Sequence, residues 1–211
     1  MAKTAVIWGV GGGIGSALAR LLIDKGWQVA GVSRDSQQAG QVTPLAFEAD
    51  FSNPNSVQAA VYGIAQEIEE IDFWVYAAGD IQSMASSSME AVDWKRILDA
   101  NLNGLYYAIH YSQALLSKDA AVYILGAVSE RMRLPGLGAY AAAKAGVEAL
   151  GDVLRKELRR SVVVVRPAAV KTSFWEKVPF KMPATAMTVE ELAEKIYQAY
   201  EANTREATLD L

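Results

Sequence analysis

The sequence predicts one α/β domain of three layers, in which a parallel sheet of about seven strands is covered by helices on both faces. Two observations carry this prediction. Short apolar runs alternate with longer amphipathic runs along the chain, as strands and helices do in a doubly wound fold. The short runs are also apolar on both faces, which is typical of strands buried between two layers of helices.

The apolar runs give the expected strands, and the amphipathic runs give the expected helices. The strands are expected over 4–8, 28–32, 43–47, 72–76, 121–125, 161–165 and 207–211. The helices are expected over 14–25, 54–70, 89–116 and 139–158, with a last helix from 188. Pro54 suits the first position of its helix, and Thr188 and Glu191 have the spacing of a capping box. The helix over 89–116 is expected to bend or break near 101–104.

Composition narrows the classes of function. The 211 residues are 52% hydrophobic and 21% charged, which fits a single folded domain over 1–211 without a linker. A net charge of −4 gives no basic surface for a nucleic acid, and no apolar run approaches the ~20 residues that span a membrane. Because the chain has no cysteine and only one histidine, His110, we expect no disulfide, no cysteine nucleophile and no metal site. These features fit a cytoplasmic protein.

A glycine-rich turn follows the first expected strand. Gly9, Gly13 and Gly15 have the spacing G-x-x-x-G-x-G, and Ile14 occupies the place that excludes the commoner G-x-G-x-x-G pattern. Such glycines permit a tight turn, let the backbone approach a pyrophosphate and let the helix pack on the strand. The helix that starts here would present free N–H groups and a favourable dipole to the phosphates. The alternative is a glycine-rich turn that binds nothing.

In this glycine spacing the sequence resembles the short-chain dehydrogenase/reductase family, and the resemblance extends over about residues 4–211. It implies a Rossmann fold, a nicotinamide dinucleotide cofactor, a small-molecule substrate and a homodimer or homotetramer. His110 would then be structural, on a helix that commonly packs in the dimers of this family. Trp8, where the family usually has threonine, is a departure.

The end of the second expected strand bears on the choice of dinucleotide. A carboxylate at this position would accept hydrogen bonds from a ribose 2′-hydroxyl, whereas an arginine can hold a 2′-phosphate through two parallel hydrogen bonds. Ser33 and Arg34 stand here, so we expect NADP(H). Asp35 leaves NAD(H) as the alternative, because a slip of one or two residues would bring its carboxylate to the ribose.

The resemblance implies further contacts with the cofactor at the ends of other strands. The residues concerned are Asp50, Phe51, Ala78, Gly79, Pro167, Val170 and Thr172. Asp50 would contact the adenine, and the Val170 backbone and the Thr172 hydroxyl would meet the nicotinamide carboxamide. The match is partial, because Tyr76 and Ala77 replace the two asparagines of the family and Ala168 replaces a glycine.

Tyr140 and Lys144 form the expected catalytic pair. Their i, i+4 spacing puts both side chains on one face of a helix. An ammonium ~4 Å away is worth about 4 kcal/mol at an effective dielectric of ~20, so it would lower the tyrosine pKa from ~10 to as low as ~7. Tyr140 could then exchange a proton with a substrate near pH 7, and by the resemblance Lys144 would also hold the nicotinamide ribose. The alternative is an exposed helical pair without a function.

Two further family positions are less regular. Asn101 matches an asparagine that is thought to hold a water relaying protons to the lysine. The catalytic serine, expected thirteen residues before Tyr140, is replaced by Ala127, which cannot donate a hydrogen bond. Either Ser129 takes its place in a rearranged loop, or the substrate needs no serine. Dihydropteridine reductases of this family have a similar Gly-Ala segment and reduce a quinonoid ring, but they carry an acidic residue where this chain has Arg34.

The segment 173–187 completes the expected site. It combines apolar side chains with prolines, so we expect a flexible apolar lid over the substrate, or else a surface loop or an oligomer contact. The sequence therefore predicts an NADPH-dependent reductase that transfers a hydride to a small carbonyl or to a quinonoid or pterin-like ring, with Tyr140 as proton donor. The rival interpretation is a non-catalytic sensor of the NADP(H) redox state, for which Ala127 is the best support.

Overall fold

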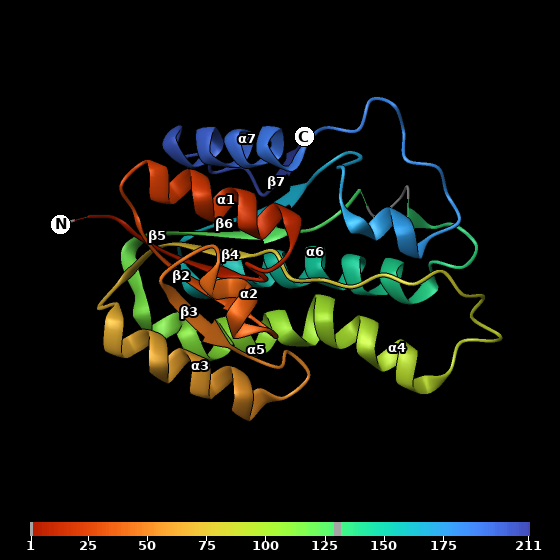
Figure 1. Ribbon diagram of the computed structural model, residues 1–211, viewed down its shortest axis with the longest axis horizontal. Helices are drawn as coiled ribbons and strands as arrows, with labels where there is room; N and C mark the ends of the chain where they lie inside the picture. Colours follow the sequence, from red (N-terminus) through yellow and green to blue (C-terminus); the bar gives the residue numbers. More distant parts are fainter. Residues whose placement is uncertain (1, 129–131) are drawn as a thin grey trace.

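A seven-stranded parallel sheet forms the middle layer of the protein. The computed structural model describes residues 2–128 and 132–211. The strands are β1 (Thr4–Trp8), β2 (Gln28–Ser33), β3 (Leu45–Glu48), β4 (Ile71–Tyr76), β5 (Leu116–Leu125), β6 (Ser161–Arg166) and β7 (Thr208–Asp210). Their order across the sheet is β3-β2-β1-β4-β5-β6-β7, and neighbours are parallel throughout (Figure 1). The predicted doubly wound Rossmann fold is confirmed.

Helices cover both faces of this sheet. They are α1 (Gly13–Asp24), α2 (Ser36–Gly40), α3 (Pro54–Glu67), α4 (Ala91–Leu98), α5 (Gly104–Ser112), α6 (Gly138–Leu158) and α7 (Val189–Glu201). Residues of α1 and α7 join the core on one face, and residues of α3, α5 and α6 join the core on the other (Figure 1). A short 3-10 turn, η4 (Ser173–Lys177), follows β6.

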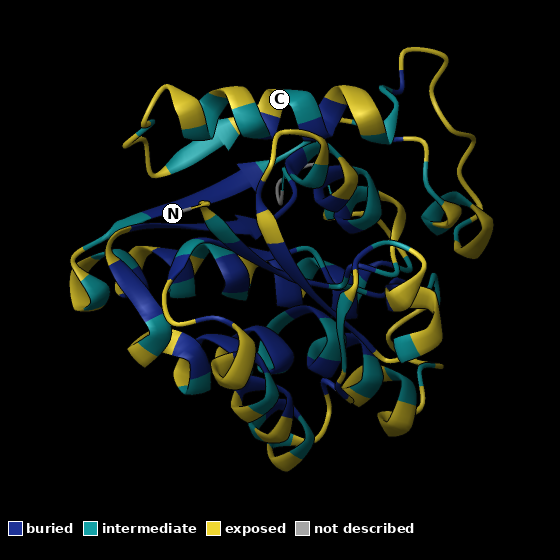
Figure 2. Ribbon diagram, turned by 60° about the vertical axis from the view of Figure 1, so that its left-hand side comes forward, coloured by how far each residue is buried: buried dark blue, intermediate teal, exposed yellow. Residues whose placement is uncertain are grey.

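The strands are apolar on both sides because both sides are buried. In β1, Val6 and Trp8 belong to the core beneath α3 and α5, whereas Ala5 and Ile7 belong to the core beneath α1 and α7. All four side chains are fully buried. Figure 2 shows the same arrangement for the whole sheet, with buried strands inside and exposed residues on the outer sides of the helices. Each large aliphatic side chain buried in this way contributes about 1.5–3 kcal/mol, so the pattern holds the three layers together.

The helix expected over 89–116 is interrupted at the predicted place. A π-helical turn, η1 (Asp99–Asn103), separates α4 from α5, and the side chain of Asn101 within it is fully buried. The prediction is wrong beyond Ser112, because a 3-10 turn follows and β5 begins at Leu116. Leu116 pairs with Ile71 of β4, so the sheet captures a residue that the local pattern assigned to the helix.

The predicted helix starts are present, and one short helix was missed. Asn53 caps α3 with its side chain and Pro54 is in the first turn, while Thr188 and Glu191 form a complete capping box on α7. The missed helix is α2, whose five residues are too few to show an amphipathic period. Asp35 caps it with its carboxylate.

The topology fixes where a ligand can bind. The chain moves outward from β1 to β3 and then returns to place β4 on the other side of β1. In sheets of this kind the reversal leaves a crevice at the carboxyl ends of the strands, and ligands bind there. Within 2–128 and 132–211, no helix has the length and apolarity to cross a membrane, and no group of metal-binding side chains is large enough to hold an ion.

Candidate active site

Two neighbouring cavities open at the carboxyl ends of β1, β2, β4, β5 and β6. The larger, of about 770 Å³, is lined by the glycine turn and by charged side chains, and we call it the cleft. The smaller, of about 480 Å³, is lined mainly by apolar side chains, and we call it the apolar cavity. Six residues line both, namely Ile14, Ala77, Ala78, Gly79, Thr172 and Phe174. The two spaces therefore adjoin one another along a shared wall.

The glycine turn forms the floor of the cleft, and it requires glycine for steric reasons. Gly9 has φ +90°, and a Cβ there would lie 2.5 Å from the backbone nitrogen of Ala78. A Cβ on Gly15 would collide with the backbone of Gly9. Gly13 begins α1, and its predecessor Gly12 offers no side chain to cap the helix. The first amides of α1 are thus available to an anion, so the turn fits a pyrophosphate.

The end of β2 lies in the wall of the cleft, as the sequence predicts. Ser33 is buried there and Arg34 is exposed, and both line the cleft. The carboxylate of Asp35 accepts hydrogen bonds from the amides of Gln37 and Gln38, at 2.9 and 3.1 Å. Asp35 is therefore engaged in capping α2, which leaves Arg34 as the freer charge for a ribose substituent.

Asp50 and Phe51 line the cleft after β3, beside the end of β2, where the Ala49 amide donates to the Ser33 carbonyl oxygen at 2.9 Å. Asp50 Oδ1 accepts hydrogen bonds from the backbone and the hydroxyl of Ser52, and these bonds, with the nearby charges of Arg34 and Lys95, lower the pKa of its carboxyl. Phe51 is buried against Trp8, with ring centroids 6.3 Å apart. The unusual Trp8 thus fills the core directly behind this side of the cleft.

Asn101 supports the cleft from below without lining it. Its side-chain amide donates to the carbonyl oxygens of Asp80 and Ile97, at 2.6 and 2.8 Å. Its Oδ1 is buried, lacks a hydrogen-bond partner among the described residues, and would lie 2.8 Å from a Cβ added to Gly79. Asn101 therefore ties the loop after β4 to the π-helical turn and leaves one acceptor available.

Tyr140 and Lys144 lie together in the wall of the apolar cavity, near the start of α6. Both are buried, with 8% and 4% of their surface exposed, which excludes the alternative of an exposed pair. The Lys144 ammonium lies 5.6 Å from the centre of the Tyr140 ring and donates to the carbonyl oxygen of Leu125 at 2.7 Å. The pair therefore faces the same space as the apolar lining.

The pKa values of the pair are set by burial. Desolvation raises the pKa of the Tyr140 phenol and lowers the pKa of Lys144 to about 8. This differs from the expectation that the ammonium alone would bring the tyrosine pKa near 7. Removing the phenol from water disfavours its charged form by more than Lys144 favours it, because the ammonium is itself desolvated and is directed at Leu125.

The remaining predicted residues are distributed around the apolar cavity. Pro167, Val170 and Thr172 line it from the loop after β6. Ala127, at the place of the family serine, also lines it and is 7% exposed. Ser129 lies outside the described residues. His110 lies on α5 among tyrosine rings, away from both cavities.

The segment 173–187 covers the apolar cavity with apolar side chains. Those that line it are Phe174, Trp175, Val178, Phe180 and Pro183. The segment is held at its start, where the Trp175 indole donates to the Val170 carbonyl oxygen at 2.8 Å. The segment thus lies beside the apolar cavity, and its role as a lid stays a prediction.

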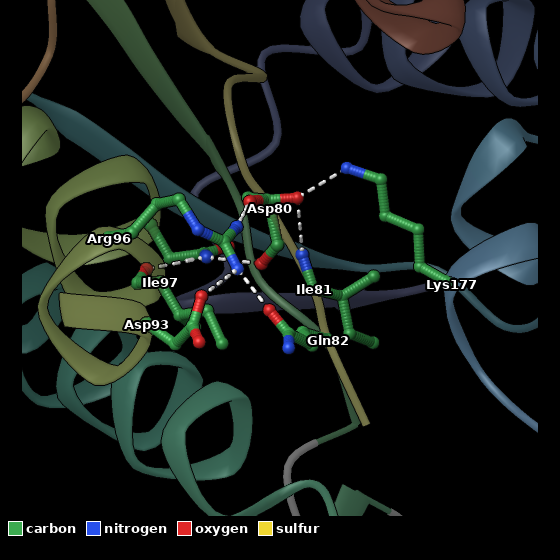
Figure 3. A network of polar contacts seen from close by, with 8 residues as sticks. Asp80, Ile81, Gln82, Asp93, Arg96, Ile97 and Lys177 are labelled. Carbon is green, nitrogen blue, oxygen red and sulfur yellow. Dashed lines mark hydrogen bonds and ion pairs between the residues drawn. The ribbon is translucent and has the colours of Figure 1, made fainter. Parts of the chain in front are cut away.

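A polar network at the edge of the cleft was not predicted. Asp80 forms ion pairs with Arg96 of α4 and with Lys177 of η4, and all three side chains line the cleft (Figure 3). The only signal in the sequence is the acidic residue directly after Ala-Ala-Gly79, at the end of an apolar strand. Its partners could not be named, because Lys177 lies 97 residues further along the chain.

Comparison with known proteins identifies the family. Residues 3–182 match the sequence model of a family described as short chain dehydrogenase. The chain belongs to the short-chain dehydrogenase family. Among curated members of this family, it is 26% identical over 181 residues to the 3-oxoacyl-(acyl-carrier-protein) reductase FabG of Staphylococcus aureus, covering 80% of this chain and 74% of that one. It is 29% identical over 189 residues to an uncharacterized oxidoreductase of Thermotoga maritima, covering 83% and 74%.

Solved structures of short-chain dehydrogenases share the fold. The aldohexose dehydrogenase of Thermoplasma acidophilum superimposes with a TM-score of 0.87 at 23% identity, covering 100% of this chain and 92% of that one. The 3-ketoacyl-(acyl-carrier-protein) reductase of Brucella melitensis, solved with NADH, gives 0.85 at 22% identity, covering 99% and 96%. The match to the family model and to its curated relatives makes the chain an oxidoreductase of the short-chain dehydrogenase family.

Proposed function

We propose that this protein is an NADPH-dependent reductase in which Tyr140 donates a proton to a small carbonyl or to a quinonoid or pterin-like ring. The observation that carries the proposal is the position of Tyr140 and Lys144. Both are buried in the wall of an apolar cavity that shares residues with a glycine-lined cleft. A hydride donor held in the cleft would meet a substrate in the cavity at this shared wall.

The residues of the cleft fit a dinucleotide. Gly9, Gly13 and the free start of α1 would hold the pyrophosphate, and the loop from Pro167 to Thr172 would hold the nicotinamide end. The bound cofactor would supply the hydride. We favour NADP(H) over NAD(H), because Arg34 can pair with a 2′-phosphate while the Asp35 carboxylate is engaged by α2.

Burial suits Tyr140 to the role of a proton donor. Because desolvation raises the pKa of its phenol, Tyr140 holds its proton at neutral pH until a substrate oxygen or nitrogen accepts it. Lys144 would stabilise the phenolate that remains, and the free acceptor on Asn101 could bind a water that helps return the proton. Positive charge on the oxidised nicotinamide would favour the same phenolate.

The apolar cavity favours a substrate that needs few hydrogen bonds. Its lining offers aromatic and aliphatic side chains, and Ala127 provides no hydroxyl where the family has serine. A plain ketone would lose the hydrogen bond that such a hydroxyl donates. A conjugated or quinonoid ring accepts a hydride more readily, which is why we propose this class beside small carbonyls, in line with the local likeness to dihydropteridine reductases.

The test is a turnover screen with Tyr140→Phe as the matched variant. NADPH and NADH are offered with aldehydes, ketones, quinones and quinonoid dihydropterin, and oxidation is followed by absorbance. We expect turnover with NADPH that falls at least ~100-fold in Tyr140→Phe, while NADPH binding is retained. If no substrate class oxidises either cofactor although NADPH binds, the second candidate, a non-catalytic redox sensor, replaces the first. The alanine at position 127 is the observation that favours this second candidate.

We also propose a cytoplasmic location and a homodimer or homotetramer. The cysteine-free chain needs no oxidising compartment. Tyr106 on α5 is 49% exposed beside His110, on the helix that the family commonly uses for dimer packing. Sedimentation equilibrium of the purified protein measures the oligomeric state directly.

A further inference from the structure

The network around Asp80 links three parts of the protein that are distant in sequence. Asp80 Oδ1 accepts hydrogen bonds from the Lys177 ammonium at 2.6 Å and from the Ile81 amide at 2.9 Å, and Oδ2 pairs with Arg96 (Figure 3). Arg96 has a second carboxylate partner, Asp93, at 3.1 Å. One buried carboxylate thus fixes both the α4 helix and the η4 turn of the lid.

Lys177 is the most exposed member of the ion pairs around Asp80. Half of its side-chain surface is exposed, against 8% for Asp80. If Lys177 moved away, Asp80 would keep Arg96 and the Ile81 amide as partners, so its charge would remain compensated. An unpaired buried charge would be costly. Lys177 can leave Asp80 for another anion without this cost, because the Asp80 carboxylate keeps two other partners.

Lys177 of the lid lines the same cleft as the glycine turn that would hold a pyrophosphate. Thr172 directly precedes the lid, and its methyl group would lie 3.9 Å from a Cβ added to Gly13, the first residue of α1. Lys177 follows five residues later and lines the same cleft as Gly13 and Arg34. Burial, Arg96 and Arg34 together lower the pKa of Lys177, so this end of the cleft is rich in positive charge. This positive charge would attract a dianionic pyrophosphate.

We propose that Lys177 is a phosphate-binding residue of the lid, which exchanges Asp80 for the pyrophosphate when the dinucleotide binds. This inference rests on the dinucleotide of the proposed function. The Asp80 carboxylate and the pyrophosphate are both anions that can accept hydrogen bonds from the Lys177 ammonium. Asp80 therefore competes with the cofactor for this ammonium. Phe174 and Trp175 on the same turn line the apolar cavity, so the exchange would also adjust the wall that the substrate contacts.

The experiment measures the dissociation constants of NADPH and NADH by fluorescence titration, without substrate. Lys177→Gln is expected to weaken the binding of both dinucleotides about tenfold. This corresponds to the loss of one charge-assisted hydrogen bond of about 1.4 kcal/mol. Lys177→Arg retains the charge and is expected to stay within about threefold of the parent. Asp80→Asn is expected to tighten both several-fold, because the competing charge is gone while Asn still accepts from the Ile81 amide. Lys195→Gln, an equal charge change on an exposed residue of α7 outside both cavities, is the control and should change neither.

Opposite signs for Lys177→Gln and Asp80→Asn distinguish exchange from a simple structural tie. If both variants weaken binding, the ion pair only holds the lid in place and the proposal is overturned. It is equally overturned if Lys177→Gln binds both dinucleotides like the parent. If Asp80→Asn does not fold by circular dichroism, titration with inorganic pyrophosphate decides, because Lys177→Gln must then weaken the binding of pyrophosphate about as much as it weakens that of the dinucleotides. If the parent itself binds neither dinucleotide, the proposed function fails, and that outcome is distinct from the failure of Lys177 alone.

Discussion

Replacing Gly9 with alanine tests the steric basis of the glycine turn. The backbone at Gly9 has φ +90°, which costs a non-glycine residue roughly 1–2 kcal/mol. The new Cβ would also lie 2.5 Å from the nitrogen and 2.6 Å from the Cα of Ala78, and backbone atoms cannot move aside as a flexible side chain can. Overpacking of this kind costs roughly a further 1–3 kcal/mol. We expect Gly9→Ala to lower the free energy of unfolding by about 3 kcal/mol.

Alanine substitutions at two other glycines separate the cost of backbone strain from the cost of the contact with Ala78. Gly26 has φ +83° and no heavy atom within 4 Å of an added Cβ, so Gly26→Ala should show the backbone strain alone, about 1 kcal/mol. Gly40, at the end of helix α2, has neither a crowded Cβ position nor a positive φ, so Gly40→Ala should be neutral or stabilise by about 0.5 kcal/mol. Urea unfolding at pH 7, with the slope checked for each variant, gives the three free energies.

The order of the three variants is what matters. If Gly9→Ala unfolds at the same urea concentration as Gly26→Ala, contact with Ala78 is not the reason for glycine at position 9. A Gly9→Ala protein that does fold should also bind NADPH more weakly, since Ala78 lines the cleft and would be displaced.

Two further predictions concern charge. Burial lowers the pKa of Lys144 to about 8 from 10.5, so above pH 8 the folded protein loses a proton that the unfolded chain keeps. The penalty for burying this ammonium, about 3 kcal/mol, is fully present below pH 8, shrinks as the pH rises and is absent above about 10.5. Lys144→Met should therefore be more stable than the parent in urea at pH 7 and lose that advantage by pH 10, while turnover is abolished; equal stability at pH 7 would contradict this. Arg34→Gln should weaken NADPH about tenfold and leave NADH unchanged in fluorescence titration, and an equal loss for both would show that Arg34 does not read the 2′-phosphate.

The sheet could be predicted from the sequence because burial on both faces imposes an unambiguous pattern. Strands β1, β4 and β6 are almost entirely apolar, and each was expected within one residue of its observed ends. The start of β5 was missed, because Leu116 follows a helical pattern and joins the sheet only through its pairing with Ile71. Pairing partners that are distant in sequence are set by the tertiary structure, so the local sequence pattern does not indicate them.

In the candidate site, too, some features could be predicted from the sequence and others could not. The positions of Gly9, Tyr140 and Lys144 could be predicted, because their spacing along the chain is fixed by a turn and by one helix. The direction of the Tyr140 pKa could not, because it depends on how completely the phenol is removed from water. The ion pair of Asp80 and Lys177 joins residues 97 positions apart, and only the course of the lid brings them together.

The π-helical turn at Asp99–Asn103 also sets the phase between two helices. Helix α4 packs beside α6, whereas α5 packs on α3, and the wide turn lets each present its own apolar side. A regular helix advances about 100° per residue, so deleting one residue from this turn would rotate α5 by that angle relative to α4. Either Leu105 would then leave the core, or Asn101 would leave its place beneath Gly79. A surface loop tolerates insertions and deletions, but in this π-helical turn they would disrupt the packing that supports the site.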